Sequence, residues 1–104
     1  MANFLTTLLK AIKEKQTVKI YFMGDYGVVI AIFRNGELKW VESTWGMGFK
    51  ELRRAIDWGG GKYSVKAVPA EDSAKENVSL KPHELVRTLF SWEVASLKLP
   101  TLSQ

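Results

Sequence analysis

Cysteine is absent from the 104-residue sequence, and histidine occurs only once, at His83. Without cysteine, the chain has no disulfide framework, no thiol nucleophile and no thiolate metal ligand. A single histidine excludes a metal centre built from several histidines. We therefore expect neither a bound metal ion nor a cofactor.

Long hydrophobic runs are also absent. The longest unbroken apolar stretch runs from Val28 to Phe33, which is far shorter than the roughly 20 residues that cross a bilayer. The first helical segment lacks the early basic group and the small-residue cleavage site of a secretory signal. We therefore expect a soluble, cytoplasmic protein without membrane attachment.

The sequence offers no recognisable catalytic set. The glycine-rich segment 59–62 looks like a phosphate loop, but Ile56 and Tyr63 occupy positions where that motif needs glycine and serine or threonine. A turn between a helix and a strand explains this segment better. His83 lies in the first turn of a predicted helix and has no evident nucleophile or acid partner. We therefore expect the protein not to be an enzyme.

The composition is that of one globular domain. Hydrophobic residues make up 46% and charged residues 25% of the chain, which is typical of a folded protein. Fifteen Lys and Arg against eleven Asp and Glu give a net charge of +4, which permits weak attraction to polyanions without implying it. We predict a single domain over residues 1–104, with a mobile loop at about 69–81 and a short tail at 98–104.

Apolar residues at helical spacing predict three helices, over residues 3–15, over residues 48–57 and from Pro82 onward. Proline fits the first turn of a helix because its missing N–H has no partner there. The last helix is apolar around most of its circumference, which predicts burial on more than one side. Pro100 is predicted to end it.

Alternating polar and apolar residues predict four strands. Asn35-Gly36 is the strongest short hairpin signal, because a type I′ turn needs positive φ at both central residues. The predicted fold class is α+β: an antiparallel three-stranded meander plus a fourth strand, with three helices packed on the sheet. We expect the fourth strand to pair with the first rather than the third. The strands are predicted at residues 17–23, 28–33, 37–43 and 63–67.

The two turns set the register of the meander. A two-residue loop at Asn35-Gly36 pairs Phe33 with Leu38 and Ala31 with Trp40. One face of the sheet is then wholly apolar and is expected to pack against helices; it comprises Val18, Ile20, Phe22, Val29, Ala31, Phe33, Leu38 and Trp40. The reverse face is mixed and needs another element or a second copy of the chain to cover it; it comprises Tyr21, Met23, Val28, Ile30, Ile32 and Val41 with Lys19 and Lys39. A two- or four-residue first turn pairs Phe22 with Val29 and Ile20 with Ala31, whereas a three-residue first turn would invert the first strand.

Five segments occur in an order that resembles a known family. They are a helix at Phe4 to Ile12, Thr17 at the head of a strand, Phe33 to Leu38 around a turn glycine, a helix at Phe49 to Ile56, and Trp58 to Tyr63, which fits W-x-x-G-x-[F/Y]. Together they resemble the PatA N-terminal (PATAN) family of bacterial signalling proteins over most of residues 4–97. The resemblance implies a non-catalytic role, because members accompany signalling modules and are thought to mediate protein contacts.

The function we expect is therefore that of a protein–protein interaction module in bacterial signalling. Its partner is a separate protein or, as a homodimer, a second copy of the chain. Tryptophan, tyrosine and methionine are typical anchors at such interfaces. The candidate partner-binding residues are Trp45, Met47, Tyr21, Ile32 and Trp92. The alternative for each of them is an ordinary place in the core.

A second hypothesis is a small, basic protein that binds single-stranded nucleic acid. Basic side chains near aromatic rings bind such strands through phosphate contacts and base stacking. The residues that would form this surface are Lys50, Arg53, Arg54, Lys62 and Lys66, near Trp58 and Tyr63. No RNA-recognition signature stands on the predicted strands, so we rank this hypothesis second.

Overall fold

The computed structural model describes residues 4–57, 63–70 and 75–102. Within these ranges the chain forms an α+β fold, as predicted. The elements are α1 (Phe4–Lys13), β1 (Val18–Gly24), β2 (Val28–Arg34), β3 (Glu37–Ser43), the short 3-10 helix η1 (Phe49–Glu51), α2 (Leu52–Asp57), β4 (Tyr63–Pro69) and α3 (Pro82–Leu102). The predicted glycine-rich turn at 59–62 lies outside the described residues.

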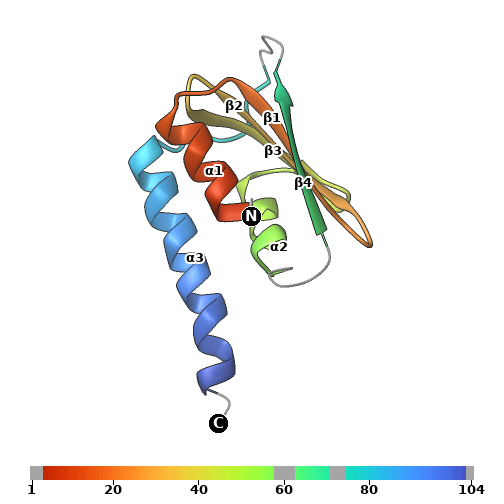
Figure 1. Ribbon diagram of the computed structural model, residues 1–104, viewed down its shortest axis with the longest axis vertical. Helices are drawn as coiled ribbons and strands as arrows, with labels where there is room; N and C mark the ends of the chain where they lie inside the picture. The colour runs from red at the N-terminus through yellow and green to blue at the C-terminus, as the bar shows by residue number, and fades with distance from the viewer. Residues whose placement is uncertain (1–3, 58–62, 71–74, 103–104) are drawn as a thin grey trace.

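The four strands form one antiparallel sheet in the order β3-β2-β1-β4. The fourth strand pairs with the first, as predicted, and Val18 lies opposite Pro69. The described helices gather on one side of this sheet, with α1 and α3 side by side and α2 beneath the strands (Figure 1). The sheet therefore has one face that the described helices cover and one face that none of them covers.

The core lies between the helices and the covered face of the sheet. Burial alternates along β2, where Val29, Ala31 and Phe33 are fully buried and the residues between them are half-buried. Ile20 pairs with Ala31 and Phe22 with Val29, as the sequence predicted. The helices contribute Leu8, Ala11, Leu52, Ala55, Ile56, Leu85 and Leu89 to the same cluster.

A β-bulge in β3 overturns part of the predicted register. Leu38 pairs with Phe33 as predicted, but the register shifts immediately afterwards. As a result Val41, and not Trp40, pairs with Ala31. An extra residue on one strand turns every later side chain to the opposite face. Val41 is therefore buried in the core, and Trp40 lies on the face without helices.

The hairpin turn between β2 and β3 has the predicted geometry. Asn35 and Gly36 both have positive φ, at 52° and 80°. The turn also packs on the connection between α1 and β1: Gly36 N–H donates to the Gln16 carbonyl at 3.0 Å, and Asn35 N–H donates to Thr17 Oγ1 at 3.1 Å. A β-carbon on Gly36 would lie 2.9 Å from the Ile12 carbonyl oxygen. Glycine is therefore required here by both conformation and space.

The last helix differs from its prediction in two ways. It continues past Pro100 to Leu102, although proline removes a backbone donor and disfavours a helical conformation at the residue before it. Its apolar residues are not all buried, since Phe90 and Val94 are 46% and 45% exposed. The prediction of burial on more than one side was wrong: among the described side chains, Leu85 and Leu89 are buried whereas Phe90 and Val94 are exposed. The last turns of α3 extend beyond the other elements (Figure 1).

Candidate functional site

The sheet face that no described helix covers is a candidate surface, and we call it the open face. Its apolar members alternate along the strands with the core residues; they are Tyr21, Met23, Val28, Ile30, Ile32, Trp40 and Val68. Most of them are half-buried by their neighbours in the sheet, and Met23 is 37% exposed. None of the described helices covers this face (Figure 1).

Lysine side chains cover two aromatic rings of the open face. The Lys19 ammonium lies 5.1 Å from the centre of the Tyr21 ring, and the Lys75 ammonium lies 5.3 Å from the centre of the Trp40 ring. Both distances are within the range of a cation–π contact. Trp40 Nε1 also donates to Glu42 Oε1 at 2.9 Å. The open face thus combines apolar, aromatic and basic groups.

Charge is unevenly distributed over the open face. Near β3, the Lys39 ammonium pairs with Glu37 at 3.3 Å and with Glu76 at 3.7 Å. Near β1 and β4, Lys19 and Lys66 make no ion pair with any residue that the structure describes. The β1–β4 side of the open face is therefore the more positive one.

The loop after β3 presents Trp45 and Met47, which are 45% and 66% exposed. Ser43 Oγ holds this loop by accepting hydrogen bonds from Trp45 N–H at 3.0 Å and Gly46 N–H at 3.2 Å. Ser43 N–H in turn donates to the Gly46 carbonyl at 2.8 Å. Backbone and side-chain bonds thus fix the loop that carries two of the predicted anchors.

Glu51 anchors the same loop from η1. Its carboxylate accepts hydrogen bonds from the Ser43 hydroxyl and from Arg54 Nε at 2.7 Å, and the residue is only 9% exposed. The hydrogen bond from Ser43, followed by that from Arg54, lowers the pKa of Glu51, although burial acts in the opposite direction. A general acid needs a raised pKa instead. The arrangement therefore favours an ionised structural anchor rather than an acid catalyst.

The five predicted partner-binding residues fall in three places. Tyr21 and Ile32 lie on the open face, while Trp45 and Met47 lie on the loop after β3. Trp92 lies on α3 and is half-buried, with its ring 4.9 Å from that of Phe49 and the Arg53 guanidinium 5.9 Å from its centre. The structure does not bring all five to one surface.

The basic residues of the nucleic-acid hypothesis are also separated. Exposed Lys50, Arg53 and Arg54 lie on η1 and α2, which are on the helical side of the sheet. Lys66 lies opposite Tyr21 on the open face, and Lys62 lies outside the described residues. The described members therefore do not form one continuous patch.

Sequence reasoning did not select Met23 or Trp40 as site residues. The alternation in β1 could have indicated Met23, since it shares a face with Tyr21. Trp40 carried no such signal, because its place depends on the bulge in β3. Both belong to the same open face as Ile32, so the described surface is broader than the predicted one.

Among the residues with a described placement, no three His, Asp or Glu side chains are grouped as metal ligands. No described helix combines the length and the apolar character needed to cross a bilayer. No protein-family model, curated protein or solved structure matches the chain.

Proposed function

We propose that the protein is a non-catalytic protein–protein interaction module that uses the open face as part of its contact surface. The observation that carries this proposal is a sheet face on which Met23 is exposed and Tyr21, Ile32 and Trp40 are only half-buried. Accessible apolar and aromatic groups gathered on one face are typical of interaction sites.

The cellular setting of this module is bacterial signalling. The resemblance to the PATAN family supports this part of the proposal, as its members accompany signalling modules. The partner is another protein or a second copy of the chain. Trp45 and Met47 extend the contact surface, since both are exposed on a loop that hydrogen bonds hold in place. A pre-ordered loop loses little entropy on binding.

Binding of single-stranded nucleic acid is the second candidate. Lys19, Lys66 and Lys75 stand on or over a sheet face that also carries the Tyr21 and Trp40 rings. Stacking platforms for single strands combine these same residue types. The two candidates differ in their response to salt, because phosphate contacts weaken steeply as the salt concentration rises whereas apolar contacts change little.

Site-specific photo-crosslinking tests the first candidate. A benzophenone amino acid replaces Met23 on the open face or, as a matched control, the exposed Lys13 on α1. We expect a discrete protein adduct in the native cells from position 23 and none from position 13. Absence of adducts, or the same adducts from both positions, would overturn the proposal. Tight, salt-sensitive binding of an oligothymidine in an anisotropy titration would favour the second candidate.

A further inference from the structure

One edge of the sheet is closed by the chain itself. Along β3, Val41 N–H donates to Asn77 Oδ1 at 2.9 Å, and the Val41 carbonyl accepts from Asn77 Nδ2 at 2.9 Å and from Gly48 N–H at 2.9 Å. The Lys39 carbonyl accepts from Asn77 N–H at 2.8 Å. The outward backbone groups at Val41 and the Lys39 carbonyl thus have partners.

At the opposite edge, no described strand pairs with the outer side of β4. Ala70 N–H donates to the Thr17 carbonyl across β1 at 3.2 Å. Because inward and outward groups alternate along an antiparallel strand, the N–H and C=O groups of Lys66 also point to β1. The N–H and C=O groups of Val65 and Ala67 then point away from the sheet. No backbone hydrogen bond joins them to another described residue, so they resemble the free edge that strand addition requires.

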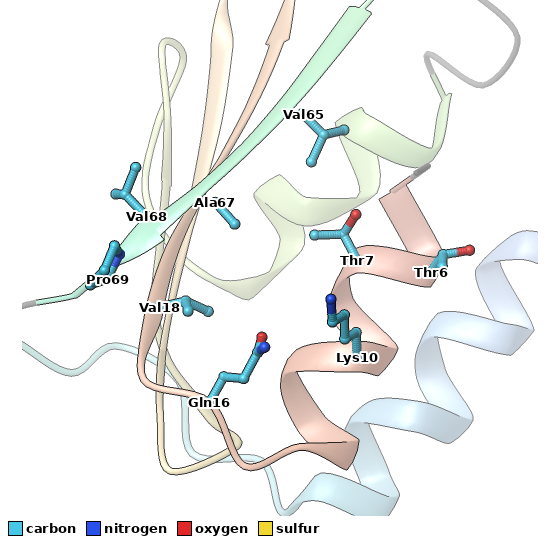
Figure 2. A pocket seen from close by; sticks show the side chains of 9 residues that line it. All are labelled: Thr6, Thr7, Lys10, Gln16, Val18, Val65, Ala67, Val68 and Pro69. Atoms are coloured by element: carbon cyan, nitrogen blue, oxygen red, sulfur yellow. The ribbon is translucent and has the colours of Figure 1, made fainter. Parts of the chain in front are cut away.

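A groove runs beside this open edge on the helical side of the sheet. It lies between α1 and β4, has a volume of about 640 Å³ and is lined mainly by apolar groups. Figure 2 shows Thr7 and Lys10 of α1 facing Val65 and Ala67 of β4 across it. Ala67 is exposed although it points to the helical side. The groove can therefore receive side chains from a strand that pairs with β4.

The described charged side chains that line the two hollows beside this edge are both lysines. Lys10 lines the groove, and Lys66 stands on the opposite face of β4, beside a smaller hollow of about 270 Å³ that Tyr21 and Met23 also line. Neither lysine makes an ion pair with a described residue. An added strand with an acidic residue at this point is favoured, because opposite charges in directly facing cross-strand positions stabilise a sheet.

A second copy of the chain fits this edge less well. Two β4 strands that pair over their full length around a two-fold axis place Lys66 opposite Lys66 of the other copy. Like charges in directly facing positions destabilise a sheet. In that register the described charges favour a foreign, acidic strand over self-association.

We infer that the β4 edge binds an extended segment of a partner protein by strand addition, with an acidic side chain opposite Lys66 and apolar side chains entering the groove beside Val65 and Ala67. Strand addition draws affinity from main-chain hydrogen bonds and specificity from pockets for alternate side chains. This inference rests on the proposed function and gives the chemistry of the partner segment.

A peptide titration followed by NMR of the full-length, isotope-labelled protein tests the inference. The probe is a capped nonapeptide of alternating valine and glutamate. We expect it to shift the amide signals of Val65 and Ala67 and to slow their hydrogen exchange by at least about tenfold, because a hydrogen-bonded amide must open before it exchanges. Two control peptides should neither shift these amide signals nor slow their hydrogen exchange. One has lysine in place of glutamate, and the other has methylated amides along its pairing edge.

Reversing the charge at position 66 provides a second, independent test of the inference. We expect Lys66→Glu to lose the response to the glutamate peptide and to gain one to the lysine peptide. The matched control Lys13→Glu makes the same charge change on an exposed position of α1 and should behave like the unmodified protein. Melting curves of both variants establish that they remain folded.

Three results would overturn the inference. One is the absence of any response at Val65 and Ala67 at millimolar peptide. Another is a response confined to Met23 or Trp45, which would leave the proposed interaction function standing with a different docking surface. The third is protection of the β4 amides that grows with protein concentration in the absence of peptide, which would identify a second copy as the occupant. Loss of the crosslink from position 23 would instead count against the proposed function itself.

Discussion

Gly27 lies so close to the Trp45 ring that a larger residue at position 27 would have to displace the ring. A β-carbon on Gly27 would lie 2.7 Å from the Trp45 ring and 2.7 Å from Thr44 Oγ1. Thr44 Oγ1 also accepts a hydrogen bond from Val28 N–H at 2.9 Å. The β1–β2 turn and the loop after β3 therefore pack against each other. This contact helps to fix the position of Trp45, one of the predicted partner-binding residues.

Gly27→Ala should displace this loop. We expect the free energy of unfolding to fall by about 1–3 kcal/mol, the usual cost of overpacking, with a change in tryptophan fluorescence of the folded state. Gly46→Ala is the matched control, because its new β-carbon would meet only Glu51 side-chain atoms, the nearest at 3.6 Å. It should change stability by less than about 0.5 kcal/mol. Equal losses in the two variants, measured by denaturant unfolding, would refute the close contact.

Glu51 should make stability depend on pH. Its pKa is lower in the folded protein than the usual value of about 4.3, chiefly through the hydrogen bond from Ser43. The unfolded chain therefore takes up protons first, so the stabilisation is present above about pH 4.3 and is lost as the pH falls through the folded pKa. We expect Glu51→Gln to cost about 2 kcal/mol at neutral pH, where two hydrogen bonds to a charged group are weakened.

The same variant supplies the pH readout. The stability difference between the unmodified protein and Glu51→Gln should shrink on acidification, as followed by denaturant unfolding at neutral and acidic pH. Glu14→Gln removes the same charge from an exposed site on the chain and should leave the pH profile of stability in place. A gap between Glu51→Gln and the unmodified protein that stays constant down to strong acid would contradict the anchor role.

Asn77 should stabilise the closed edge of the sheet. Its side chain makes two hydrogen bonds to the backbone of Val41, each worth about 1 kcal/mol. We expect Asn77→Ala to lower the free energy of unfolding by about 2 kcal/mol and to speed hydrogen exchange at the Val41 amide. Ser79→Ala, at an exposed position of the same segment, serves as the control. An Asn77→Ala variant as stable as this control would argue against the closed edge.

Truncation of two adjacent residues on α3 should reduce stability by very different amounts. Leu89 is fully buried, and we expect Leu89→Ala to cost about 3 kcal/mol, as cavity-forming substitutions do. Phe90 is 46% exposed, so Phe90→Ala should cost under about 0.5 kcal/mol. Thermal melts compare the two. A large loss from Phe90→Ala would mean that α3 is buried on more than one side, as its sequence alone suggested.

Local patterns predicted those parts of the fold that neighbouring residues decide. Asn35-Gly36 indicated the hairpin because its backbone conformation is a local property, and both residues do have positive φ. The period-2 alternation likewise placed Tyr21 and Ile32 on one face of the sheet. The expected pairing of β4 with β1 is observed, although the order of the elements along the chain also allowed β4 to pair beside β3.

Contacts between residues far apart in the chain could not be predicted from local sequence patterns. Trp40 and Val41 are both apolar, so alternation could not say which of them enters the core, and the bulge decided it. Asn77, which bonds to Val41, comes 36 positions after it, and nothing in the surrounding sequence indicates that pairing. The difference between the two sheet edges, on which the inferred strand addition depends, is therefore visible only in three dimensions.

Residue-resolved hydrogen exchange of the isolated protein tests the contrast between the two edges most directly. We predict fast exchange at the outward amides of Val65 and Ala67, and slow exchange at the inward amides of Lys66 and Val68. The Val41 amide also points outward but should exchange slowly, because Asn77 accepts its hydrogen bond. Protection of Val65 and Ala67 equal to that of their inward neighbours in a dilute sample would contradict the account, since something must then already cover the β4 edge.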